Sequence, residues 1–285
     1  MPVAPLVSPL FLLSGIGMIL VAVCSVWLWQ RGKRSLWPEV WWGVLAWVVS
    51  VAVKTAVTLP TNSLMQRHSG NPLIWVYAGL LTGIFECAIP VLLIKKSRLR
   101  QADWNRAVAF GIGFGGIEAF LLGLGALVPI VLLLAAPGQI PAATRDTWVQ
   151  ELRTDGLISI VLPIVERAAT LVVHVLSSVL LIYAVRMRQQ RWFWLAFVYK
   201  TAVDGVAGWA ILAWKVAESI GKTAVLEVVI VLFALIAVAA LPSLKARFAR
   251  LDQLQESAAA LTSGDPQRST AQRRHLSQGQ VTPKP

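Results

Sequence analysis

Eight charged or titratable residues stand inside long apolar stretches of this 285-residue sequence. They are Lys54, Glu86, Glu118, Glu166, Arg167, His174, Lys200 and Asp204. If these stretches cross a lipid bilayer, each charge costs roughly 2.5–3.5 kcal/mol at mid-membrane, so residues of this kind are usually functional. Carboxylates can act as general bases, and a histidine or an ammonium can stabilise a developing negative charge. The set therefore indicates a shared polar interior suited to acid–base chemistry.

The spacing of some of these residues places them on a common helical face. Glu166, Thr170, His174 and Ser177 recur at steps of four, four and three, which is the period of one face of an α-helix. This polar face runs from the outer third of a span to its middle. It predicts a water-filled pocket that is open to one side.

A structural interpretation competes with the functional one. The interior holds four acids and three bases, so ion pairs could cancel most of the charge and hold the helices together. Lys200 and Asp204 are one helical turn apart and could pair, which fits both interpretations equally well. Glu118 and His174 have no obvious partner near them in the sequence, and this favours a functional role for both.

The rest of the sequence is typical of a membrane protein. Apolar residues make up 56% of the chain and charged residues 14%, and the mean hydropathy is +0.67. Soluble proteins usually carry about 25% charged residues, and the apolar runs here exceed the roughly 18 residues that cross a bilayer. We predict an all-α fold, a polytopic helical bundle of about seven transmembrane helices. The expected spans are residues 6–29, 40–60, 73–94, 107–134, 157–185, 192–214 and 222–242.

The distribution of Lys and Arg predicts the orientation of the chain. The connections after the first, third and fifth spans, together with the tail, hold 18 of these residues, against 5 in the other connections. Cytoplasmic connections carry the excess of Lys and Arg, so the N-terminus should lie outside and the C-terminus in the cytoplasm. A prokaryotic inner (plasma) membrane is the expected location. The same pattern accounts for the net charge of +12 without a nucleic-acid partner.

Two regions of different composition are expected. Residues 1–245 should form the seven-helix transmembrane domain, and residues 246–285 a basic cytoplasmic tail. The end of the chain is rich in Gln, Ser, Ala, Thr and Pro with scattered charge. A segment of this kind cannot bury a core, so we expect the tail to be disordered.

Glycines crowd the stretch before Glu118. Residues 111–119 read Gly-Ile-Gly-Phe-Gly-Gly-Ile-Glu-Ala and match the spacing of a dinucleotide-binding G-x-G-x-x-G loop. That interpretation fails because no βαβ unit surrounds the stretch. Inside a span, Gly111 and Gly115 stand one turn apart and allow another helix to approach closely. Such packing would hold Glu118 against neighbouring spans.

The same stretch resembles the G-x-G-H-G-G-x-E-A signature of the YhfC family of intramembrane proteases. That family is related to the type II CAAX prenyl endopeptidases and to PrsW-like proteases. Other segments agree with the family in order, and the resemblance covers roughly residues 5 to 242. The agreeing segments are Phe85-Glu86, Glu166-Arg167 followed by His174 and Ser177-Ser178, and Asp204. The resemblance implies an intramembrane protease in which a glutamate activates water and histidines bind a metal or stabilise the oxyanion.

Two positions depart from the family's pattern. Phe114 stands where the signature has a histidine one turn before the glutamate, and Lys200 stands where the family has a histidine one turn before Asp204. Glu118, His174 and Asp204 could supply the three protein ligands that a zinc site needs. Lys200 would repel a cation beside them, so we expect no bound metal and no other cofactor.

A metal-free mechanism is compatible with the residues that remain. In it, Glu118 acts as the general base on water, and His174 and Lys200 stabilise the oxyanion. The predicted catalytic set is Glu118, His174, Lys200 and Asp204. The predicted supporting polar interior is Lys54, Glu86, Glu166 and Arg167.

Three functions are open at this point. The first is an intramembrane peptidase that cleaves a transmembrane or lipidated protein. The second is a catalytically degenerate relative that binds membrane-protein partners as a scaffold, as the Aph-type subunit of γ-secretase is thought to do. The third is an ion-coupled transporter, which ranks last because the sequence shows no internal repeat and no pair of broken spans in matching positions. Retention of five costly interior residues places the peptidase slightly ahead.

Overall fold

The computed structural model describes residues 7–33 and 35–262. Seven helical segments in this part are long and apolar enough to cross a membrane, which confirms the predicted all-α bundle. The helices are α1 (Leu12–Gln30), α2 (Trp37–Arg67), α3 (Pro72–Gly83), α4 (Ile89–Lys96), α5 (Trp104–Ala135), α6 (Ala142–Asp155), α7 (Ile158–Met187), α8 (Gln190–Leu212) and α9 (Ile220–Thr262). The described part divides into two compact units, with the boundary between residues 241 and 242.

Local sequence signals set several of the helix ends. Asn71 precedes Pro72, and its side chain accepts a hydrogen bond from the backbone nitrogen of Leu73 at 3.0 Å. Asp103 caps α5 by accepting from the backbone nitrogen of Arg106 at 2.9 Å. Both caps satisfy amide groups that the first turn of a helix leaves without a partner.

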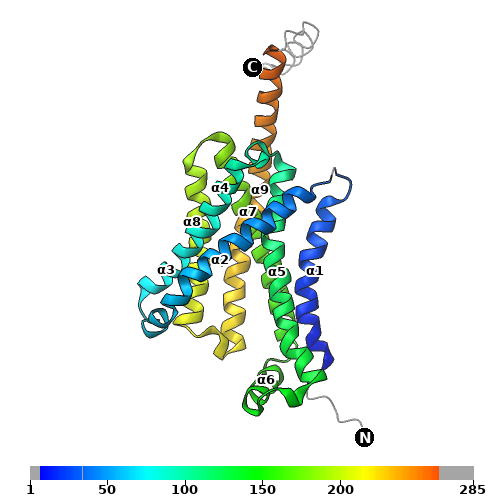
Figure 1. The fold of residues 1–285 in the computed structure, drawn as a ribbon, viewed down its shortest axis with the longest axis vertical. Helices are drawn as coiled ribbons and strands as arrows, with labels where there is room; N and C mark the ends of the chain where they lie inside the picture. Colours follow the sequence, from blue (N-terminus) through cyan, green and yellow to red (C-terminus); the bar gives the residue numbers. More distant parts are fainter. Residues whose placement is uncertain (1–6, 34, 263–285) are drawn as a thin grey trace, which may run out of the picture. The chain divides into compact units, whose positions relative to one another are not determined.

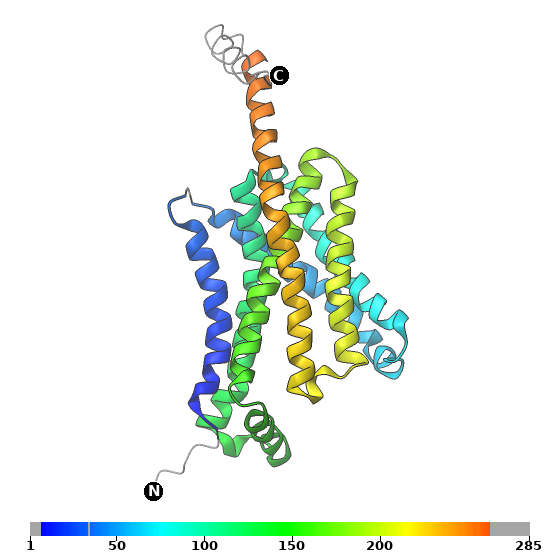
Figure 2. The ribbon, with the colours of Figure 1, turned by 180° about the vertical axis from the view of Figure 1, so that it is seen from behind.

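Helix α7 lies at the centre of the first unit. In the most apolar 18 residues of α7, 78% of the residues are buried, compared with 44% in the most apolar 18 residues of the span formed by α3 and α4. Helix α5 packs against α1, α2 and α7, while α3 packs against α8 (Figures 1 and 2). In Figure 1, α2 crosses α5 obliquely. The polar face predicted on α7 therefore points into the bundle.

Glycines bring the backbones of α2, α5 and α7 into close contact. A Cβ atom on Gly113 would lie 2.0 Å from the carbonyl oxygen of Val40 in α2. A Cβ atom on Gly111 would lie 2.7 Å from Cα of Val175 in α7. Neither position tolerates a side chain, in agreement with the packing expected from small residues in membrane helices. This close approach holds the Glu118 end of the glycine stretch between two neighbouring helices.

A short π-helix interrupts the third span. Residues Ile84–Ala88 connect α3 to α4 with this wider turn, which contains Glu86. Such turns inside α-helices are frequent at functional sites. Here the π-helix places a carboxylate in the interior of the bundle, where its side chain is 3% exposed.

Two helical segments differ from the prediction. Helix α6 lies outside the expected spans, and it packs Trp148, Val149 and Leu152 against a small core that includes Leu133 and Ile140. Residues 246–262, expected to belong to a disordered tail, continue α9 as a helix. This part of the tail is rich in Ala, Leu, Arg and Gln, which are strong helix formers. The remaining tail residues, 263–285, lie outside the described part.

Candidate functional site

A cavity of about 590 Å³ lies among α2, the third span, α5, α7 and α8. All eight polar residues singled out from the sequence line it: Lys54, Glu86, Glu118, Glu166, Arg167, His174, Lys200 and Asp204. Its wall continues past Thr58 to Met65 on α2 and to Ile211 on α8. The cavity therefore extends towards the end of the bundle where α2 and α8 end.

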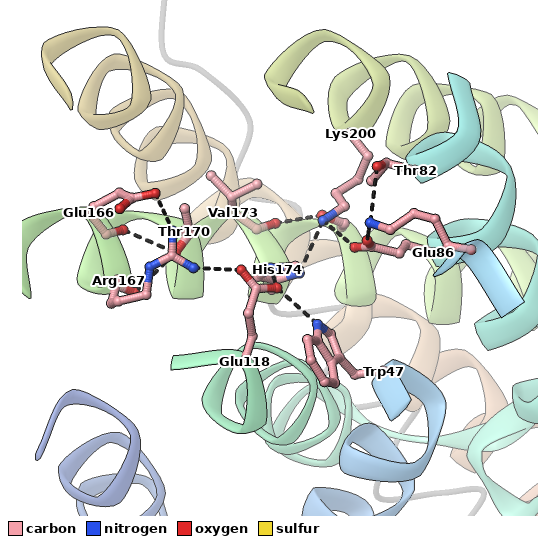
Figure 3. A network of polar contacts seen from close by, with 12 residues as sticks. Trp47, Thr82, Glu86, Glu118, Glu166, Arg167, Thr170, Val173, His174 and Lys200 are labelled. Carbon is pink, nitrogen blue, oxygen red and sulfur yellow. Dashed lines mark hydrogen bonds and ion pairs between the residues drawn. The ribbon is translucent and has the colours of Figure 1, made fainter. Parts of the chain in front are cut away.

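Glu118 is held by three side chains from two helices (Figure 3). Its Oε1 atom is 2.6 Å from Nη1 of Arg167. Its Oε2 atom accepts a hydrogen bond from Nε1 of Trp47 at 2.9 Å and lies 3.0 Å from Nε2 of His174. The side chain is 20% exposed. A carboxylate can accept about four hydrogen bonds, so Glu118 retains one acceptor position for a molecule in the cavity.

His174 joins Glu118 to Lys200. Its Nδ1 atom is 3.2 Å from Nζ of Lys200, and its Nε2 atom faces Glu118. An ammonium group has donors only, so contact with charged Lys200 requires an unprotonated Nδ1. With Nδ1 as the acceptor, Nε2 can donate to Glu118.

Lys200 and Lys54 converge on Glu86. The Nζ atom of Lys200 is 2.8 Å from Oε2 of Glu86, and the ammonium of Lys54 forms an ion pair with Oε1 of the same carboxylate. Lys54 also donates to Oγ1 of Thr82 at 3.2 Å. Lys200 and Glu86 are each only 3% exposed at the side chain. The contacts thus form one unbroken line of side chains, which runs through Arg167, Glu118, His174, Lys200, Glu86 and Lys54.

The remaining two predicted residues lie at the edge of this line. Glu166 forms an ion pair with Arg167, its neighbour in sequence. Asp204 lines the cavity, but no ion pair joins it to Lys200 within residues 7–33 and 35–262. The pairing that the spacing allows is replaced by contact of Lys200 with Glu86, which comes from a different span.

Two further residues belong to the polar interior and were not predicted from the sequence. Trp47 binds Glu118 through its indole nitrogen and stands seven residues before Lys54, on the same face of α2. Glu227 on α9 is buried at 6% exposure, and its Oε2 atom has no hydrogen-bond partner among the described residues. The rule that selects Glu118 also selects Glu227, since both are acids inside an apolar run.

Phe114 closes one side of His174. The two rings lie with centroids 5.1 Å apart at an angle of 41°, and Phe114 is 3% exposed. The side chain that departs from the family signature is therefore in direct contact with the interior histidine. Phe114 provides an apolar contact at the position where the histidine of the family signature could bind a metal ion.

The side chains around His174 do not fit a bound metal ion. A zinc site takes three or four ligands from His, Cys, Asp and Glu, and no group of three such residues gathers in the part of the chain that the structure describes. One nitrogen of His174 faces Glu118, and the ammonium of Lys200 lies 3.2 Å from the other. That ammonium would repel a cation bound at Nδ1.

Comparison with known proteins identifies similar sequences. The sequence profile of the YhfC intramembrane metalloprotease family matches residues 17–231. The uncharacterized membrane protein YhfC of Bacillus subtilis (strain 168) is 29% identical over an alignment of 143 residues, which covers 46% of this chain. The match covers 55% of that relative, so the chain spans about half of its length. No solved structure matches the chain.

Proposed function

The chain belongs to the family of YhfC intramembrane metalloproteases, and from this premise we propose that it hydrolyses peptide bonds in the cavity around Glu118. The observation that carries the proposal is the contact of Glu118 with His174, which in turn contacts Lys200, on the wall of that cavity. A base, a cation suited to an oxyanion and a histidine that connects them are thus within reach of one substrate. We propose transmembrane or lipidated proteins as substrates.

Glu118 acts as the general base in this proposal. Three of its roughly four acceptor positions are taken by Arg167, Trp47 and His174, and the fourth receives a proton from water. The resulting hydroxide attacks the carbonyl carbon of the scissile peptide. When the C–N bond breaks, Glu118 returns the proton to the leaving nitrogen. The products are a carboxylic acid and an amine, which become a carboxylate and an ammonium once the acid passes its proton to the amine.

Lys200 stabilises the oxyanion in this proposal, and His174 orients Lys200 and Glu118, because its two ring nitrogens face those two side chains. The ammonium of Lys200 has three donors, of which Glu86 and His174 engage two. The third donor is available to a developing negative charge in the cavity. Such preorganised donors in a site of low dielectric constant are usually the largest single contribution to catalysis. Asp204 lines the same cavity and is proposed to position the substrate.

These steps involve no metal ion, although the family is described as one of metalloproteases. The donor set around His174 does not suit a divalent cation, and Lys200 places a fixed positive charge in the same region. We propose that this ammonium provides the positive charge needed near the oxyanion.

The experiment compares membrane-protein N-termini by mass spectrometry in cells that express the wild type or Glu118→Gln. The substitution preserves shape and removes the base. Glu218→Gln is the matched control, because Glu218 is 60% exposed and lies outside the cavity. New N-termini near membrane spans should require Glu118 and be unaffected by Glu218→Gln. Identical N-termini in the wild type and a folded, abundant Glu118→Gln variant would exclude catalysis through Glu118.

A second candidate function is binding of membrane-protein partners without cleavage. One observation favours it: both oxygens of Glu118 are already held by donors from three side chains. This arrangement also suits a carboxylate that only joins helices. Under this alternative, Glu118→Gln would leave all N-termini unchanged but alter which membrane proteins copurify with the chain.

We also propose the orientation of the chain in its membrane. The excess of Lys and Arg supports an orientation with the N-terminus outside and residues 246–285 in the cytoplasm of a prokaryotic inner membrane. The cavity then opens towards the outside, because its wall reaches Met65 and Ile211. Labelling of a cysteine introduced at Met65 by an impermeant reagent tests this. Labelling only after the membrane is permeabilised would reverse the orientation.

A further inference from the structure

A second hollow of about 540 Å³ lies between α4 and the start of α8, with the end of α7 as its floor. It shares no lining residue with the cavity around Glu118. Ala184 and Val185 of α7 form part of the floor. The walls include Leu92 on α4 and Trp194 on α8. We refer to this hollow as the α4–α8 groove.

The lining of the α4–α8 groove is polar at one end and apolar elsewhere. Lys95 stands near the end of α4, and Arg188 stands in the turn between α7 and α8. The apolar walls include large exposed side chains, since Leu92 is 57% exposed and Trp194 is 54% exposed. In a membrane such side chains face lipid. The groove therefore combines cations at its end with apolar walls along its length.

The two cations of the groove differ from two nearby arginines in having no protein partner in the described part, a property that they share with Lys96 and Arg100 outside the groove. Arg98 and Arg106 both form ion pairs with Glu39. The side chains of Lys95 and Arg188 have neither an ion pair nor a hydrogen bond within the described part of the chain. Both are exposed. Their charges are free to meet an anion from outside the protein.

The backbone at Arg188 provides an independent observation. Arg188 ends α7 in the left-handed conformation, with φ 53° and ψ 36°. This is the position where helices commonly place glycine, because a side chain there clashes with its own backbone. Strained residues of this kind often belong to functional sites. An arginine at a position that favours glycine indicates a role for its guanidinium.

We propose that the α4–α8 groove binds an anionic phospholipid. Its phosphate lies between Lys95 and Arg188, and an acyl chain follows the apolar walls past Leu92 and Trp194. Arginine suits this task because its planar guanidinium can donate two parallel hydrogen bonds to one phosphate. Basic pockets between membrane helices are known sites for anionic head groups. The proposal is independent of the peptidase activity.

Native mass spectrometry of the delipidated full chain tests the proposal. The protein is titrated with phosphatidylglycerol and, separately, with phosphatidylcholine of the same acyl chains. The wild type should bind the first phosphatidylglycerol about tenfold or more tightly than phosphatidylcholine. Equal affinity for the two lipids would overturn the proposal, because apolar contact alone would then explain binding.

Two variants locate the site. Lys95→Ala combined with Arg188→Ala should remove the preference for phosphatidylglycerol. The control pair is Lys96→Ala with Arg100→Ala, which removes the same charge from exposed residues outside the groove. The control should keep the preference. If both pairs lose it equally, the attraction is a general effect of positive charge and the groove is not a site.

Arg188→Gly separates lipid binding from folding. Glycine relieves the strain of the left-handed conformation, so the lipid-free variant should unfold at a higher temperature than the wild type. Its affinity for phosphatidylglycerol should nevertheless fall several-fold, because the guanidinium is gone. Unchanged affinity in this variant would overturn the role of Arg188. Excess inorganic phosphate should not displace the lipid, and displacement would identify a phosphate site instead.

Discussion

Most charged side chains of the cavity are paired with one another, whereas the two cations of the α4–α8 groove have no protein partner among the described residues. In the cavity, ion pairs and hydrogen bonds connect Arg167 to Lys54 without a break. In the groove, Lys95 and Arg188 have no protein partner within the described residues. A buried charge is costly unless the protein pairs it, whereas a cation near the membrane surface can be paired by lipid head groups or water.

Paired and unpaired charges in a membrane protein call for different arguments about the ligands that they bind. A paired interior charge reveals its role by what it contacts, so the roles of Glu118 and His174 are argued from their neighbours. An unpaired cation at the end of a groove is instead a candidate for binding an anion from outside the protein, so the role of Lys95 and Arg188 is argued from their position in the groove. The predictions below test this difference between the two regions.

The largest effect is expected for Glu118→Gln in the cavity. Loss of a general base typically lowers a rate about 10²–10⁴-fold. The measurement is cleavage of a substrate found by N-terminal mass spectrometry, with purified protein in lipid nanodiscs. Glu218→Gln is the control and should retain wild-type activity. Activity within threefold of wild type in Glu118→Gln would assign the base to another residue.

Arg167→Met should destabilise the fold strongly. It leaves the carboxylates of Glu118 and Glu166 without their shared cation. Breaking a buried ion pair on one side costs about 3–5 kcal/mol. The free energy of unfolding in detergent measures this loss. Arg188→Met, in the groove, should change it by less than about 0.5 kcal/mol, and similar losses in both variants would remove the distinction between the two regions.

Gly113→Ala tests the packing that positions the cavity wall. The new methyl group would meet the carbonyl oxygen of Val40, so α2 and α5 must separate. Overpacking of this kind costs about 1–3 kcal/mol. Gly125→Ala is the control, because a Cβ atom there meets nothing within 4 Å. Equal stability of the two variants would show that α2 and α5 can separate freely.

The smallest effect is expected from metal removal. If Lys200 supplies the positive charge of the site, dialysis against a strong chelator should leave cleavage by the purified protein within about twofold of its starting rate. Lys200→Met should lower the rate by far more, about 10²-fold, as loss of an oxyanion donor does. Inhibition by the chelator that zinc reverses would contradict a metal-free mechanism.

The sequence predicts much of the cavity because membrane insertion makes polar residues conspicuous. Seven apolar runs gave seven spans, and each interior charge or histidine chosen by that rule lines one cavity. The rule works without knowledge of contacts, since lipid-facing positions rarely hold charge. The same rule would have added Glu227, had it been applied to the first residues of the seventh span.

The partners within the cavity could not be predicted from the sequence. Local spacing suggests Asp204 as a partner for Lys200, but Lys200 contacts Glu86 from a distant part of the chain. That contact depends on the π-helix, which no composition signal marks. The left-handed conformation of Arg188 could not be predicted either, because helices usually place glycine at such a position and this chain has an arginine.

The π-helix at Ile84–Ala88 makes the third span two half-helices with separate registers. An α-helix turns about 100° per residue, so deletion of one residue in this segment would restore a straight helix while rotating one half against the other. If the half that carries Glu86 rotates, Glu86 loses its contact with Lys200. If α3 rotates instead, the face of α3 that packs against α8 turns away from it. Single-residue deletions are usually tolerated only in loops. Such a deletion would change the register of the third span without altering either side chain of the Lys200–Glu86 ion pair.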